Sequence, residues 1–197
     1  MSILEIRLFG DPVLRQEARE VTDFDERLRR LAADMFDTMR AAPGVGLAAN
    51  QVGVLKRLFT WEVVDVHEDE DAESGEQATV RGHAVVNPVV EDASEESLLD
   101  EEGCLSFPGL FYPVERPLRA RMRWQDLDGE EHRSDVEGFD ARVWLHELDH
   151  LNGIVFIDHL AKHDRKEAMS RMREYRLSQG TDEPRPAGGL LLGRKRL

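Results

Sequence analysis

The sequence is poor in cysteine, in long apolar runs and in net positive charge. Its 197 residues include a single cysteine, Cys104, so an intramolecular disulfide is excluded and secretion gains no support. No stretch approaches the ~20 apolar residues that cross a bilayer, and the first residues lack the charged start and apolar run of a signal peptide. We therefore expect a cytoplasmic protein without a membrane partner.

The charge balance is acidic. The formal net charge of -14 at pH 7 disfavours nonspecific binding to DNA. Much of the acidic charge lies at 67–77 and 91–102, which we interpret as solvated loops. The hydrophobic content of 41% suits one domain with a core. We expect that domain over residues 1–177 and a disordered tail, rich in proline and glycine, over 178–197.

Apolar side chains at helical spacing predict helices over 23–42, around 139–151 and over 163–177. Thr22 or Asp23 is the candidate cap of the first helix. The side chains expected on the apolar faces of the second and third helices are Phe139, Val143, Trp144, Leu148 and Leu151, and Ala168, Met169, Met172 and Tyr175, respectively.

Segments rich in β-branched and aromatic residues predict strands, with Pro88 indicating an edge or a bulge. The predicted strands are residues 58–66, 83–90, 118–125 and 130–136, the last two forming a hairpin around a turn at 126–129. The remaining expectations are a short strand or extended arm at 3–9, a loop or insertion at 67–82 and an acidic connection at 91–100.

Residues 146–150 read His-Glu-Leu-Asp-His, the pattern HExxH. On a helix His146 and His150 lie one turn apart on one face, so both can bind one metal ion. Glu147 can then reach a water on that metal as a general base. The alternative is a helix whose histidines are satisfied by ordinary hydrogen bonds, so a metal site needs further ligands from elsewhere in the chain.

Cys104 is a candidate third ligand. One thiolate and two imidazoles would leave a fourth tetrahedral position for water, which is typical of catalytic sites and not of closed structural ones. The alternative is an inert buried thiol. These ligand types admit Zn, Fe, Ni or Co, and affinity order alone does not choose among them.

Small residues dominate the segment 44–53, whose one long amide is Gln51. A buried glutamine amide can donate a hydrogen bond to a developing oxyanion. A phosphate-binding loop is disfavoured because no Lys-Ser or Lys-Thr follows the glycines. A plain tight turn before a strand stays open as the simpler interpretation.

Two other classes of HExxH protein fit less well. The metzincin pattern requires a histidine at position 156, which is Phe156 here. A thermolysin-type site needs a downstream acidic ligand, for which Glu167 and Glu174 are candidates only by default. Cys104, upstream of the motif, is the better third ligand.

Three segments together resemble the signature motifs of the peptide deformylase family. They are GVGLAANQ at 44–51, EGCLS at 102–106 and HELDH at 146–150, and GDPVLR at 10–15 resembles the family's opening segment. The resemblance, which spans roughly residues 3–165, implies an α+β fold with antiparallel β-sheets packed around a central helix that carries HExxH, and the helix expected at 163–177 adds a C-terminal helix to it. It also implies a hydrolase that removes the N-formyl group from the formyl-methionine of newly synthesised proteins and releases formate.

The resemblance assigns roles to named residues. Cys104, His146 and His150 would hold one divalent metal ion, typically Fe(2+), and Glu147 would be the general acid/base. Gln51 and the backbone N–H of Leu105 would form the oxyanion site. Metal-bound water would attack the formyl carbonyl. The implied partners are N-formyl-methionyl nascent peptides and, transiently, the ribosome.

The methionine side chain needs an apolar pocket. Val45 and Val143 are the expected lining, because each lies close in sequence to a catalytic residue. The expected substrate-binding residues are Gly44, Val45, Gly46, Gly103 and Val143. Three residues depart from what the family leads one to expect beside the motif, namely Leu145, where glutamine is usual, and the bulky Arg142 and Trp144.

Two alternatives to a deformylase are a structural or degenerate metal protein and a different metallohydrolase such as a peptidase. Against the first, the chain keeps every residue that the chemistry requires, including Glu147 and Gln51, which a degenerate copy would most readily lose. Cleavage of an internal peptide bond would favour the second.

Overall fold

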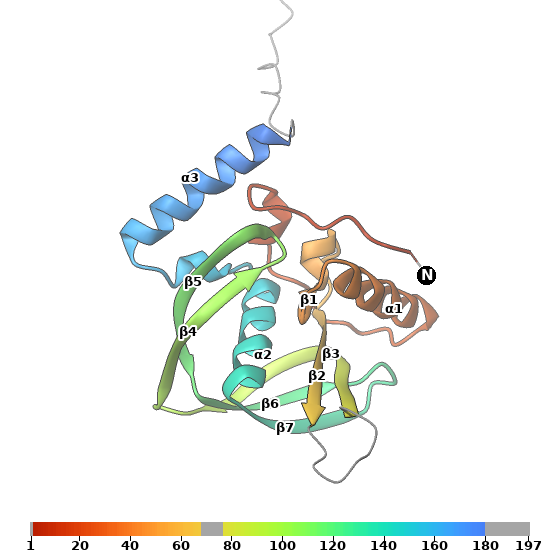
Figure 1. Ribbon diagram of the computed structural model, residues 1–197. Helices are drawn as coiled ribbons and strands as arrows, with labels where there is room; N and C mark the ends of the chain where they lie inside the picture. Colours follow the sequence, from red (N-terminus) through yellow and green to blue (C-terminus); the bar gives the residue numbers. More distant parts are fainter. Residues whose placement is uncertain (1, 68–76, 180–197) are drawn as a thin grey trace, which may run out of the picture.

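The computed structural model describes residues 2–67 and 77–179 and has an α+β architecture (Figure 1). Its helices are α1 (Glu26–Ala41), α2 (Gly138–Leu151) and α3 (Lys162–Ser178), with 3-10 turns η1 (Pro12–Arg15), η2 (Ala49–Val52) and η3 (Phe156–Asp158). The strands are β1 (Gly46–Ala48), β2 (Leu58–His67), β3 (Gln77–Ala93), β4 (Ser97–Cys104), β5 (Phe107–Pro117), β6 (Arg119–Gln125) and β7 (Glu131–Glu137).

The strands form two antiparallel sheets around α2. Five strands pair in the order β1-β2-β3-β6-β7, and β4 pairs with β5 in a separate hairpin. Helix α2 contacts β1, β2, β6 and β7 of the larger sheet and β5 of the hairpin, and it runs through the middle of the molecule in Figure 1. The predicted α+β fold with antiparallel sheets around a central helix is confirmed.

Helix α2 is central because its apolar side chains are buried on the larger sheet. Trp144 meets the rings of Phe59, Trp61 and Trp124 in edge-on contacts. Such aromatic contacts add to the free energy gained by burial. The helix ends at Leu151, as predicted. Gly153 follows the helix end with a φ of 72°, a left-handed conformation that a β-carbon would make unfavourable. Phe139, expected on the apolar face, is instead 52% exposed.

Helix α1 begins later than predicted. Its cap is Asp25, whose carboxylate accepts hydrogen bonds from the backbone N–H groups of Arg27 and Leu28, so neither Thr22 nor Asp23 caps it.

Helix α3 buries Ala168 and Met172, but Met169, also expected on its apolar side, is 46% exposed.

The described parts of two predicted acidic loops include strands. Strand β3 begins at Gln77 and pairs with β2 out to His67, so the expected loop at 67–82 is wrong for its described ends, and residues 68–76 lie outside the described part. Residues 97–100 belong to β4, and the expected connection at 91–100 is shorter. The backbone pairing of β4 with β5 holds that strand although Asp100 and Glu101 are exposed.

The segment at 3–9 is an extended arm and not a strand, and Arg7 N–H donates to the carbonyl of Gln51. The predicted bulge at Pro88 is confirmed by a register shift between Val86 and Val89.

Within the described residues, none of the helices combines the length and apolar character needed to cross a bilayer. The expected disordered tail, apart from Ser178 and Gln179, lies outside the described residues.

Candidate metal and catalytic site

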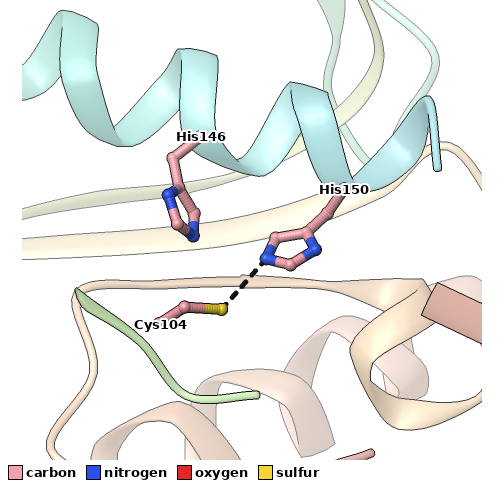
Figure 2. Close-up of side chains that lie close together, drawn as sticks. All are labelled: Cys104, His146 and His150. Carbon is pink, nitrogen blue, oxygen red and sulfur yellow. Dashed lines mark hydrogen bonds between the residues drawn. The ribbon is translucent and has the colours of Figure 1, made fainter. Parts of the chain in front are cut away.

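The structure brings Cys104, at the end of β4, against His146 and His150 of α2 (Figure 2). One ligand atom from each of the three residues lies within 4.8 Å of those of the other two, and Cys104 Sγ is 3.2 Å from His150 Nε2. Both histidines are buried. A thiolate and two imidazoles suit a borderline divalent cation, and three protein ligands are the number found in catalytic sites.

Glu102 fixes the orientation of the His146 ring. Its Oε2 atom lies 3.0 Å from His146 Nδ1, which leaves Nε2 to face the site. Burial alone would raise the pKa of Glu102, but hydrogen bonds from His146 and Arg116 outweigh it and hold that pKa well below its usual range. Glu102 therefore stays ionised and accepts a hydrogen bond from the Nδ1–H group of His146. The His146 ring then carries its proton on Nδ1 and leaves Nε2 free, which is the tautomer that a metal ligand requires.

Glu147 is buried beside these three side chains. Its Oε2 atom has no hydrogen-bond partner within the described residues, although it is enclosed. A buried carboxylate oxygen without a partner fits a site that is completed by a metal and its water. Burial raises the pKa of Glu147 to about 7, a value suited to taking up and returning a proton near neutral pH.

Gly46 makes room for Glu147. A β-carbon at position 46 would lie 2.3 Å from Glu147 Oε1, so no other residue fits here without displacing the carboxylate. Gly44 is similarly constrained, since its β-carbon would approach Leu105 Cδ1 to 2.6 Å. Gly44 and Gly46 therefore allow close approach to the site and are more than parts of a plain turn, whereas Gly53, with a φ of 81°, is the turn residue that ends η2.

Gln51 is buried in η2, and its amide is held in one orientation. The backbone N–H of Ala48 donates to Gln51 Oε1 at 2.7 Å. The Nε2 group therefore faces the site, where it lies 3.5 Å from Cys104 Sγ and 3.2 Å from Ser106 Oγ. The amide of Gln51 is therefore fixed beside the ligand set.

A cavity of about 630 Å³ opens beside the ligand set. All five residues expected to bind substrate line it, together with Gln51, Leu105 and Glu147. Val143 is buried, whereas Val45 is 41% exposed and lies toward solvent. Cavities of this volume with apolar walls and a few polar groups are typical of ligand sites. The aromatic side chains of Phe111 and Phe139 also line it and were not predicted.

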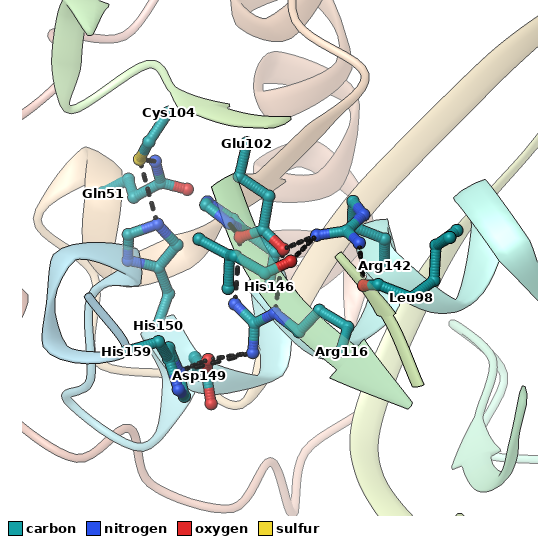
Figure 3. A network of polar contacts seen from close by, with 11 residues as sticks. Gln51, Leu98, Glu102, Cys104, Arg116, Arg142, His146, Asp149, His150 and His159 are labelled. Atoms are coloured by element: carbon teal, nitrogen blue, oxygen red, sulfur yellow. Dashed lines mark hydrogen bonds and ion pairs between the residues drawn. The ribbon is translucent and has the colours of Figure 1, made fainter. Parts of the chain in front are cut away.

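A buried polar network beside the site was missed by the sequence reasoning (Figure 3). Arg116 donates to both oxygens of Glu102 and, at 2.6 Å, to Asp149 Oδ2. The only signal in the sequence was Glu102 itself, which lies two residues before Cys104 in a segment already singled out. Of the three departures, Leu145 and Trp144 pack into the core and only Arg142 lines the cavity.

The ligand set, the adjacent glutamate and the central helix define a class, that of the metal-dependent hydrolases with an HExxH helix. Residues 3–166 match the family model described as polypeptide deformylase. The chain belongs to the polypeptide deformylase family, as the resemblance predicted.

Relatives and solved structures agree. A peptide deformylase of Novosphingobium aromaticivorans is 43% identical over 188 residues, covering 89% of this chain and 98% of the relative. Peptide deformylase 1 of Corynebacterium glutamicum is 45% identical over 173 residues, covering 88% and 96%. A crystal structure of peptide deformylase from Ehrlichia chaffeensis matches with a TM-score of 0.81 at 38% identity, covering 90% of this chain and 99% of that one.

Proposed function

We propose that this chain removes the N-formyl group from the terminal formyl-methionine of newly synthesised proteins and releases formate. The observation that carries the proposal is the convergence of Cys104, His146 and His150 at the wall of a largely apolar cavity, beside a Glu147 oxygen that has no partner among the described residues. The family match over most of the chain supports the same activity. If the formyl carbonyl of the substrate lies at the ligand set, the methionine side chain lies in the cavity.

Cys104, His146 and His150 would hold one divalent ion, which supplies Lewis acidity toward water and the formyl carbonyl. Glu147 takes the proton of the attacking water and returns it to the leaving amine. Gln51 Nε2 and the backbone N–H of Leu105 donate to the oxygen that becomes negative. The native ion we propose is Fe(2+), on the strength of the family resemblance, with Zn, Ni and Co as ions that the same donors accept.

A peptide panel tests the reaction class. We expect metal-loaded protein to release formate from formyl-Met peptides and to leave the unformylated peptides intact. Acetylated Met peptides are the matched control, because one added methyl group tests how closely the site fits the formyl carbon. Cleavage of an internal peptide bond would contradict the proposal and assign a peptidase activity.

Val143→Asp should raise KM for formyl-Met peptides by at least about 10-fold, because a carboxylate would replace an apolar wall of the cavity. Steady-state kinetics measure the effect, with Val143→Ala as the control that keeps the wall apolar. The melting temperature of each variant shows whether the fold persists. An unchanged KM in a folded Val143→Asp protein would remove Val143 from the pocket.

We propose that the chain acts in the cytoplasm, where nascent chains leave the ribosome, and that residues 1–177 form one catalytic domain. The net charge of -14 restricts any contact with ribosomal RNA to a local basic region. Arg194, Lys195 and Arg196 form such a cluster in the sequence. Deletion of residues 178–197 should lower co-sedimentation with ribosomes at low salt and leave formate release unchanged. Equal pelleting of both proteins would remove the tail from the contact.

A further inference from the structure

The β4–β5 hairpin and helix α2 bring the ligands together from separate parts of the fold. In the part of the chain that the structure describes, the hairpin pairs with no strand of the larger sheet, on which α2 packs. Cys104 belongs to the hairpin, whereas His146 and His150 belong to the helix. Side-chain contacts that join the hairpin to the helix therefore contribute to the spacing between thiolate and imidazoles.

Three residues along one face of α2 make polar contacts to the hairpin. Arg142, His146 and Asp149 follow at spacings of four and three residues, which places them in a row on a helix. His146 and Arg142 both contact Glu102 of β4, and Asp149 accepts from Arg116 of β5. Figure 3 shows this row with the two hairpin side chains between its ends.

Of the three residues, Arg142 makes the most hydrogen bonds to the hairpin. Its Nη1 atom donates to Glu102 Oε1 at 2.7 Å and to the carbonyl of Val114 at 2.8 Å. Its Nη2 atom donates to the carbonyl of Leu98 at 2.7 Å. One side chain of α2 thus binds both strands of the hairpin, and it does so with only 5% of its surface exposed.

The carboxylate of Glu102 is held from three sides. Arg116 contributes Nε at 2.8 Å and Nη2 at 3.0 Å, Arg142 contributes Nη1, and His146 lies at the remaining position. Because Glu102 orients the His146 ring, a shift of Glu102 moves a metal ligand. The planar fork of arginine serves several acceptors at fixed angles, which an ammonium group does not.

We propose that Arg142 is a positioning residue, which fixes the hairpin that carries Cys104 against the helix that carries His146 and His150. The inference rests on the proposed function, since it concerns the residues assigned there as metal ligands. It accounts for an arginine that is buried in the wall of the cavity. The competing explanation is that Arg142 is only a wall of the substrate pocket.

The test compares Arg142→Met and Arg142→Lys with the wild-type protein in Co(II) titrations of the metal-free chain, followed by thiolate-to-Co(II) absorption. Loss of a residue that contacts the metal ligands but not the metal typically lowers metal affinity by roughly 10–100-fold. We expect Arg142→Met to weaken Co(II) binding within that range. Arg142→Lys should recover part of the loss through its contact with Glu102. Arg15→Met is the control, because Arg15 forms an ion pair with Asp158 away from the ligand set.

Kinetic constants and the melting temperature of the metal-free proteins complete the test. The proposal expects weaker Co(II) binding and a lower kcat at saturating metal in Arg142→Met, and no change in either for Arg15→Met. Co(II) affinity and kcat equal to wild type, with only KM raised or only the melting temperature lowered, would overturn it. A wild-type protein that binds no Co(II) would instead refute the proposed function.

Discussion

Glu147→Gln should lower the rate of formate release by about 10²–10⁴-fold, the range that a positioned general base contributes. The amide has nearly the shape of the carboxylate but cannot take up a proton. Glu147 is buried, its pKa is raised to about 7 by burial, and one of its oxygens has no partner within the described residues. The loss should appear in kcat at saturating peptide.

A measurement of metal binding shows whether the lower rate comes from loss of the general base or from loss of the structure of the site. Co(II) affinity of Glu147→Gln should stay close to that of the wild type, because Glu147 is not among the three ligands. Glu137→Gln is a matched control, since Glu137 precedes the same helix and its side chain is 66% exposed. Retention of full activity by Glu147→Gln would show that the proton transfer is carried by another group.

Cys104→Ala should weaken metal binding by more than the roughly 100-fold that loss of a residue contacting a ligand reaches, because it removes one of the three proposed ligands. The structure places this thiol 3.2 Å from His150 Nε2, and it is the only cysteine of the chain. A metal present at 100 times its dissociation constant stabilises the wild type by about 2.7 kcal/mol. For a chain of this length that corresponds to a rise of roughly 5–11 °C in melting temperature.

The variant should lose this rise, while its metal-free melting temperature stays close to that of metal-free wild type. His150→Ala provides an independent comparison, because it removes a ligand from the helix and not from the hairpin. A Cys104→Ala protein that keeps the full metal-dependent rise would show that the thiol is not a ligand.

The parts of the site that could be predicted are those encoded locally. His146, Glu147 and His150 follow one another on a helix, so their spacing alone indicated a shared face. Cys104 lies more than forty residues away on a separate hairpin, and residue types alone left its role open. The family resemblance, carried by three short motifs, assigned it.

The network around Glu102 could not be predicted, because its partners lie on elements that are distant in sequence from β4 or pair with it only in the folded chain. Arg116 lies on β5 and Arg142 on α2, and only the packed structure brings them to one carboxylate. The same limit explains the error at β4. Residues 97–101 are exposed along their length, so the strand lacks the alternation of apolar and polar side chains by which strands are recognised.

The most direct test of the whole account is anaerobic release of formate from formyl-Met-Ala-Ser by the Fe(II)-loaded chain. We predict sustained turnover that is absent from the metal-free protein, returns when Fe(II) is added back, and leaves Met-Ala-Ser as the second product. A chain whose Co(II) spectrum shows a filled thiolate site, but which releases no formate when loaded with Fe(II), would contradict the account.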